Sequence, residues 1–279
     1  MMNKALILNL LRLSRPINVL ITALSIGVAG IIAGIGDNGW QLGLAMISAG
    51  LIAAAANTVN DYYDIEIDRI NKPERPIASG SIEPSVARSA SSLEYLLGTL
   101  IAAFISLPAL AMAAFFSALT WIYASFFKRQ PLSGNAVVSI STAAAFIYGG
   151  IAVNNYAETI YPAIFAFFFH FGREIIKDME DMEGDKAAGA RTLPLVHGTG
   201  AAKQLIWINF LLLTIATLFP WYQGEYGPIY MWIVLIGVYP VLTYCLYVLQ
   251  GEPTPKQLNF LSNLLKADML VGLLAVYLR

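Results

Sequence analysis

The sequence of 279 residues is 57% hydrophobic and only 13% charged, with a net charge of −1. Soluble proteins carry about 25% charged residues, so this composition indicates a membrane protein. The near-neutral charge, without a block of basic residues, argues against nucleic acid as a partner. The lone cysteine, Cys245, excludes a disulfide framework and a cysteine-based metal site.

Nine apolar runs approach the ~20 residues needed to cross a bilayer. They cover residues 17–35, 40–60, 92–107, 109–126, 133–153, 160–177, 203–221, 228–249 and 259–278. The third and fourth runs are separated only by a very short turn at Pro108. The pattern predicts an all-α, polytopic protein with nine transmembrane helices.

The distribution of Lys and Arg predicts the orientation of these helices. Basic residues occur before the first run, between 61 and 91, at Lys128 and Arg129, between 173 and 203, and at Lys256. The alternate connections, around Asp37, Pro108, Glu158 and Glu225, contain none. By the positive-inside rule, we expect a multi-pass protein of the cell membrane with a cytoplasmic N-terminus and an external C-terminus.

Two acidic motifs share one spacing, and each follows an apolar run on the predicted cytoplasmic side. They are Asp61-x-x-Asp64-x-x-x-Asp68 and Asp178-x-x-Asp181-x-x-x-Asp185. On a continuous helix this spacing places three carboxylates on one face. Two such rows facing each other would form a basin of oxygen ligands, which suits Mg²⁺ and phosphate substrates. The repeat also predicts one domain with two related halves, about 1–130 and 131–279.

Basic residues gather on the same side as the acidic motifs. They are Arg15, Arg69, Lys72, Arg75, Lys128, Arg129, Arg173 and Lys177. Cations facing carboxylate-bound metal ions are suited to holding a diphosphate. The stiff basic segment 71–76 either closes over such an anion or simply connects two helices, and the sequence leaves both interpretations open.

Lys266, Asp268 and His170 are further ionisable residues inside the apolar runs. Lys266 and Asp268 are the deepest, and either a role in an internal cavity or a structural ion pair fits them. His170 stands alone in an apolar helix, where a buried structural role is the favoured interpretation.

These motifs resemble those of the UbiA superfamily of membrane prenyltransferases, and the resemblance covers essentially the whole chain. It rests on Asn60-Asp61-x-x-Asp64-x-x-x-Asp68, Asp178-x-x-Asp181-x-x-x-Asp185, Arg15-Pro16-x-Asn18 and Tyr123-x-x-x-x-Lys128. It implies nine helices around one central cavity, with active-site loops at the cytoplasmic end. The implied occupants are a polyprenyl diphosphate, expected to be geranylgeranyl diphosphate, a lipid acceptor and two Mg²⁺ ions.

The charge pattern and the resemblance together give each of these residues an expected role. The expected metal ligands are Asn60, Asp61, Asp64, Asp68, Asp178, Asp181 and Asp185. The expected diphosphate-binding residues are Arg15, Asn18, Arg69, Lys72, Arg75, Tyr123, Lys128 and Arg173. The residues expected to be catalytic are Asp64, Asp68, Asp181, Asp185 and Lys177.

Within the superfamily, the chain most resembles an archaeal subfamily of ether-lipid biosynthesis. The supporting stretches are 15–18, 60–68, 75–80 and 173–185. This resemblance implies transfer of a geranylgeranyl group from its diphosphate to the hydroxyl of geranylgeranylglyceryl phosphate. One alternative is the same chemistry on an aromatic acceptor, as in quinone or haem O biosynthesis. The other is an ion or proton transporter, although transporters place such carboxylates near the membrane midplane and both motifs here lie at helix ends.

Overall fold

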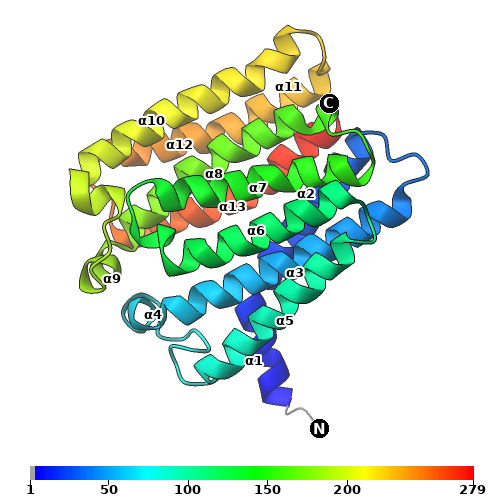
Figure 1. Cartoon of the computed structure of the whole chain (residues 1–279). Coiled ribbons are helices and arrows are strands. Elements are labelled where there is room, and N and C mark those ends of the chain that lie inside the picture. Colours follow the sequence, from blue (N-terminus) through cyan, green and yellow to red (C-terminus); the bar gives the residue numbers. More distant parts are fainter. Residues whose placement is uncertain (1–3) are drawn as a thin grey trace.

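The computed structural model describes residues 4–279, and within this range all regular secondary structure is helical (Figure 1). The longer helices are α1 (Lys4–Ser14), α2 (Pro16–Ile32), α3 (Gly39–Tyr63), α5 (Pro84–Ala102), α6 (Leu107–Ser125), α7 (Ser133–Ala152), α8 (Ile160–Glu180), α10 (Leu193–Tyr222), α12 (Tyr239–Gln250) and α13 (Pro255–Tyr277). The shorter ones are α4 (Ile65–Asn71), α9 (Met182–Ala187), α11 (Pro228–Ile233), the 3₁₀ turns at Phe127–Arg129 and Ala157–Thr159, and a π-helical turn at Val234–Val238.

Helix length and composition make the chain a multi-pass membrane protein. Six helical units within the described residues are long and apolar enough to cross a membrane, namely α3, α6, α7, α10, α11 to α12, and α13. The pair α1 and α2 makes a seventh if its 49° bend is counted within one span. Helices α5 and α8 pack in the same bundle but do not meet this criterion. The count of nine spans therefore stays a prediction.

Every predicted apolar run falls on a helix, but one boundary was wrong. Helix α5 ends at Ala102 and α6 already begins at Leu107, so Pro108 lies in the first turn of α6. The side chain of Ser106 accepts a hydrogen bond from the backbone N–H of Ala109 and caps this helix. Proline is tolerated here because the first turn of a helix needs no N–H from it.

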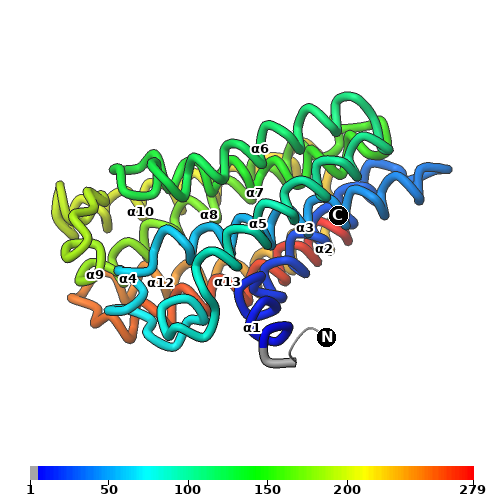
Figure 2. Tube along the Cα trace, turned by 60° about the horizontal axis from the view of Figure 1, so that its bottom comes forward, coloured from blue at the N-terminus to red at the C-terminus, as the bar shows by residue number. Residues whose placement is uncertain are grey.

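The helical path breaks at Arg15, between α1 and α2. Arg15 has a φ of 51°, a left-handed conformation that is costly for a residue with a side chain. Pro16 follows it, and proline disfavours the α conformation in the residue before it. As a result α1 leaves the line of α2, which can be followed in Figure 2. The break turns Arg15 toward the end of α3, where its side chain meets Asp61.

The helices form two groups, each with its own apolar core. Buried side chains of α8, α10, α11, α12 and α13 form the largest cluster, and those of α2, α3, α5, α6 and α7 form a second. Helix α2 packs against α3, α7 and α13, and so helps to join the groups. Gly149 permits a close crossing of α7 over α2, because a Cβ there would lie 2.5 Å from the carbonyl oxygen of Ile26.

Helices α4 and α9 lie at one end of the bundle, and the C-terminus lies toward the other end (Figure 1). They contact each other, and they directly follow α3 and α8. The two acidic motifs therefore meet at the same end of the molecule.

Candidate active site

Both acidic motifs contain a helix break at their middle aspartate. Asp64 is the single residue between α3 and α4, with φ −97° and ψ 9°. Asp181 is the single residue between α8 and α9, with φ −90° and ψ 6°. The predicted row of three carboxylates on one continuous helix is therefore wrong. Like charges at helical spacing destabilise a helix, and the break turns the third aspartate of each motif onto a short helix.

The first motif is buried in a network of charges. Arg75 donates hydrogen bonds to both carboxylate oxygens of Asp68 at 2.8 Å, and it also lies 3.1 Å from Asp61. Asp61 pairs with Arg15 as well. Both carboxylates are almost fully buried, with exposed fractions of 3% for Asp61 and 4% for Asp68. The segment 71–76 is thus tied to the first motif through Arg75.

Asp64 has a different partner, Lys128, which reaches it from the turn between α6 and α7. Burial alone would lower the pKa of Lys128, but the charge of Asp64 outweighs it and raises that pKa. Tyr123 is buried nearby and lines the same cavity. The predicted Tyr123-x-x-x-x-Lys128 stretch therefore faces the first motif.

The second motif is less completely paired. The Lys72 ammonium lies 3.3 Å from Asp181, and the side-chain amide of Asn135 donates to Asp178 at 2.9 Å. The carboxylate of Asp185 has no hydrogen-bond or ion-pair partner among the described residues, although it is buried. Burial raises the pKa of Asp185 to about 6. Burial also raises the pKa of Asp68, in spite of Arg75.

A cavity of about 600 Å³ connects the two motifs with the interior of the bundle. Its polar end includes Asn60, Asp64, Asp68, Asp178, Asp181, Asp185, Lys72, Arg75 and Lys128. Its remaining wall includes apolar side chains such as Ile52, Phe116, Phe146, Phe165 and Val234. This volume is in the range of small-molecule sites. A charged end joined to an apolar interior suits an amphiphile with an anionic head.

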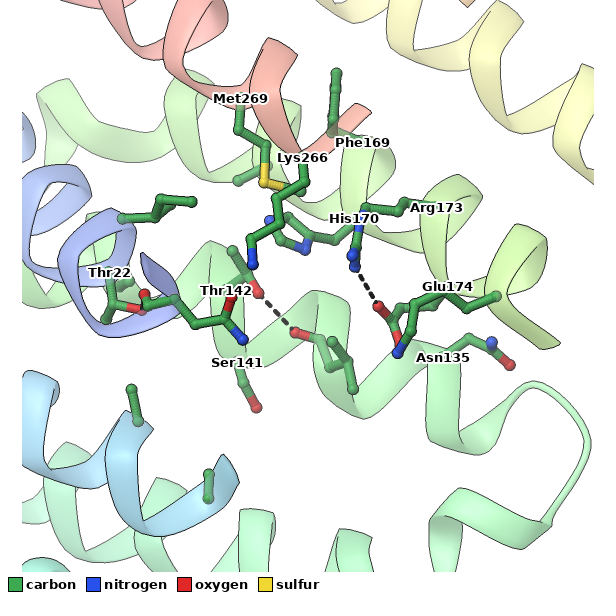
Figure 3. A pocket seen from close by; sticks show the side chains of 18 of the residues that line it. Thr22, Asn135, Ser141, Thr142, Phe169, His170, Arg173, Glu174, Lys266 and Met269 are labelled. Atoms are coloured by element: carbon green, nitrogen blue, oxygen red, sulfur yellow. Dashed lines mark hydrogen bonds and ion pairs between the residues drawn. The ribbon is translucent and has the colours of Figure 1, made fainter. Parts of the chain in front are cut away.

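Other predicted residues are distributed unevenly around this cavity. Arg15, Asn18 and Lys177 line it. So do Arg173, His170 and Lys266, which are drawn in Figure 3. Asp61 lies behind the wall and orients Arg15 and Arg75. Arg69 is exposed and pairs with Glu66 at 2.6 Å, away from the cavity. Asp268 does not line the cavity, and it forms no ion pair with Lys266 within the described residues.

Sequence reasoning missed several polar residues of the site. Asn135 holds Asp178, Asn57 accepts a hydrogen bond from Asn18 at 3.3 Å, and Glu174 is buried beside Arg173. A polar amide or carboxyl within an apolar helix was the available signal, because such groups usually face the bundle interior. Some of their partners lie far away in sequence, so these pairings could not be predicted from the local sequence.

The donor chemistry of the site fits Mg²⁺. Asn60 Oδ1 is buried without a hydrogen-bond partner in the described part of the chain, and it lines the cavity beside Asp64 and Asp68. No three acidic, His or Cys side chains of residues 4–279 come close enough together to hold a metal ion alone. Mg²⁺ is usually bound through one or two carboxylates together with substrate phosphates, and oxygen ligands divided between two motifs suit that mode.

Comparison with known proteins identifies the family. The model of the UbiA prenyltransferase family matches residues 19–265. The chain belongs to this family. Both the predicted superfamily and the prenyltransferase class are therefore confirmed, and the transporter alternative is set aside.

Two similar proteins match this chain over nearly its whole length. The digeranylgeranylglyceryl phosphate synthase of Methanopyrus kandleri is 34% identical over 265 residues, which cover 95% of this chain and 96% of that protein. A solved structure described as digeranylgeranylglyceryl phosphate synthase superimposes with a TM-score of 0.76 and 29% identity, covering 97% of each chain.

A third similar protein, a UbiA homologue from Archaeoglobus fulgidus, was solved with DMAPP and Mg²⁺. Its TM-score is 0.70 at 21% identity, with 95% of this chain and 99% of that one covered. At this identity the similarity confirms the shared fold.

Proposed function

We propose that this chain transfers a geranylgeranyl group from geranylgeranyl diphosphate to the free hydroxyl of geranylgeranylglyceryl phosphate. The product would be digeranylgeranylglyceryl phosphate, an archaeal ether-lipid precursor. The acceptor is supported by the 34% identity, over 95% of the chain, to a synthase named for that product.

The reaction type is supported most by one observation, the meeting of two carboxylate-bearing helix breaks at the charged end of an apolar cavity. A diphosphate needs cations, and a prenyl chain needs an apolar wall that excludes water. Both are present in a single continuous space. Exclusion of water also protects an allylic cation from hydrolysis.

We expect two Mg²⁺ ions, one at each motif. The proposed ligands are Asn60, Asp64 and Asp68 at the first motif, and Asp178, Asp181 and Asp185 at the second. The Archaeoglobus fulgidus homologue, described with DMAPP and Mg²⁺, supports the choice of metal. Bound Mg²⁺ would act as a Lewis acid that neutralises the diphosphate oxygens.

Basic side chains of the protein would also stabilise the negative charge of the diphosphate. Lys128, Arg75 and Lys72 now pair with aspartates of the two motifs. They are therefore placed to donate charge-assisted hydrogen bonds to a diphosphate that binds between those motifs. As the bond from C1 to the diphosphate oxygen lengthens, negative charge builds up on the leaving group, and these fixed donors stabilise it. The hydroxyl proton of the acceptor then passes to a carboxylate of the site or to the released diphosphate.

The topology is part of the same proposal. We propose nine spans in one domain of two related halves, with α5 and α8 crossing the membrane alongside the apolar helices. The absence of Lys and Arg from alternate connections supports a cytoplasmic N-terminus and an external C-terminus. The site would then open toward the cytoplasm.

An acceptor competition tests the function. The purified protein, with geranylgeranyl diphosphate and Mg²⁺, is given geranylgeranylglyceryl phosphate and 4-hydroxybenzoate together. We expect digeranylgeranylglyceryl phosphate as the product. Prenylated 4-hydroxybenzoate alone would contradict the proposed acceptor and support the aromatic alternative.

A further inference from the structure

One cation of the cavity has no role in the site described so far. Lys266 lies on α13 and lines the cavity beside His170 of α8 (Figure 3). It is the twelfth residue of α13, about 16 Å along the helix axis from its first residue at 1.5 Å per residue. No hydrogen bond or ion pair of its ammonium is found among the described residues.

The charges around Lys266 do not balance. The guanidinium of Arg173 lies 2.8 Å from Glu174, and the ammonium of Lys177 lies 3.4 Å from the same carboxylate. A single carboxylate is therefore shared by two cations, and Lys266 adds a third positive charge to the same part of the cavity. The charges of Arg173, Arg15 and Lys177 all act on Lys266, and Arg15 is itself paired with Asp61.

The framework of this cluster is fixed by contacts between α8 and α13. The side-chain amide of Asn259 donates to Glu180 at 2.7 Å, and Nε of Arg173 donates to the carbonyl oxygen of Ser262 at 3.1 Å. Lys266 lies one turn further along α13 than Ser262. Because the two helices are held in register, Arg173 and Lys266 remain on the same wall of the cavity.

An unpaired cation in a membrane-embedded cavity is costly, and an anionic ligand would offset that cost. The donor's diphosphate has other cations available. Lys72, Arg75 and Lys128 form ion pairs with aspartates of the two motifs, where the diphosphate would bind. Lys266 forms no pair with either motif. Arg173, Lys177 and Lys266 thus outnumber the one carboxylate that pairs with them, Glu174, and this local surplus of positive charge indicates a second anionic group.

We propose that Lys266 and Arg173 bind a phosphate monoester carried by the acceptor, at a subsite separate from that of the donor's diphosphate. This inference rests on the proposed function, because the acceptor there is a glycerol phosphate. Its phosphate and its reacting hydroxyl are on neighbouring carbons, so the two groups must lie within a few ångströms of each other. Arg173 is one helical turn from Lys177, which is next to Asp178, and this places the subsite adjacent to the diphosphate.

Steady-state kinetics with two acceptors tests the subsite. Geranylgeranylglyceryl phosphate is compared with geranylgeranylglycerol, which lacks the phosphate, using the wild type, Lys266→Met and the control Lys256→Met. Lys256 is exposed in the first turn of the same helix. We expect Lys266→Met to raise the KM for the phosphorylated acceptor roughly tenfold to hundredfold, the usual effect of losing a hydrogen bond to a charged group. The KM for geranylgeranyl diphosphate and the turnover of geranylgeranylglycerol should stay within about twofold of wild type.

Lys266→Arg keeps the charge and should retain most of the affinity for the phosphorylated acceptor. An equal loss with both acceptors, or a rise in the donor's KM instead, would overturn the proposal. So would an unchanged KM for the phosphorylated acceptor.

Glycerol 1-phosphate provides a test without any variant, which remains informative if Lys266→Met fails to fold. It should inhibit the wild type competitively against the acceptor and not against geranylgeranyl diphosphate. Inhibition competitive with the donor would contradict a separate subsite. If the wild type uses no glycerol phosphate acceptor at all, the proposed function fails. Binding of glycerol 1-phosphate to the wild type and to Lys266→Met then still tests the subsite: we expect the variant to bind at least about tenfold more weakly, and equal binding would overturn the proposal.

Discussion

Asp64 and Asp181 hold equivalent positions, each as the single residue between a long helix and a short one, with nearly identical backbone angles. The long helices α3 and α8 bring both residues to the same end of the bundle, and the short helices α4 and α9 contact each other there. Asp64 and Asp181 therefore face one cavity from two sides. A diphosphate placed between them would be reached by both motifs.

Replacing either of these aspartates should remove most of the transfer activity without unfolding the protein. We expect Asp64→Asn and Asp181→Asn each to lower kcat by roughly 10²- to 10³-fold, the usual loss when a group that stabilises transition-state charge is removed. The measurement is product formation from geranylgeranyl diphosphate at saturating Mg²⁺. Asp37→Asn, in the connection between α2 and α3, is the matched control and should keep full activity. Near-normal turnover by both variants would contradict the assignment.

Arg75 should be essential for stability as well as for binding. It holds two buried carboxylates, Asp61 and Asp68, so its removal leaves charges without a partner in a buried environment. We expect Arg75→Gln to destabilise the folded state by about 3–5 kcal/mol. Adding Asp68→Asn should restore part of that loss, which thermal unfolding in detergent would measure. Equal stability of wild type and Arg75→Gln would contradict this account of the network.

Mg²⁺ binding should weaken as the pH falls through about 6. Burial raises the pKa of Asp185 to about 6, so in the metal-free folded protein its carboxyl is largely protonated below that pH. A metal ion must displace this proton, and its apparent affinity therefore rises with pH. Titrating the protein with Mg²⁺ in the presence of diphosphate at pH 5 and pH 7 measures the effect. Asp185→Asn should reduce the difference, and an undiminished difference in that variant would assign it to another group.

The crossing of α7 over α2 should not tolerate a side chain at Gly149. A Cβ there would lie 2.5 Å from the carbonyl oxygen of Ile26, so the helices must separate. We expect Gly149→Ala to lower stability by about 1–3 kcal/mol. The matched control is Gly43→Ala on α3, where a Cβ meets nothing within 4 Å. That control should gain up to about 1 kcal/mol from helix propensity. Equal effects of the two substitutions on thermal unfolding would argue against the close crossing.

Features of the fold that depend on local sequence could be predicted, and those that depend on distant contacts could not. Apolar runs placed every longer helix except α1, and proline positions explain many helix starts, because these signals lie within a single turn or span. The polarity of Asn135 was visible in the sequence, but its bond to Asp178, 43 residues away, was not. The breaks at Asp64 and Asp181 also escaped prediction, because the spacing alone fits a continuous helix equally well.

In the site, too, residue types could be predicted from local sequence, whereas contacts between distant residues could not. The two motifs and most of their basic partners were identifiable by residue type and by the predicted side of the membrane. Which cation pairs with which aspartate depends on the packing of separate helices, as with Lys128 and Asp64. Arg69 shows the limit most clearly, since it adjoins Asp68 in sequence but points to Glu66 on the exposed side of α4.

The most direct test of the two-sided site is a crystal structure with Mn²⁺ and the unreactive thio-analogue of geranylgeranyl diphosphate. Anomalous scattering from Mn²⁺ locates each ion independently of the protein density. We predict one ion on Asp64 or Asp68 and a second on Asp181 or Asp185, with the diphosphate between them. Ions confined to one motif, or a diphosphate bound away from both, would contradict the account.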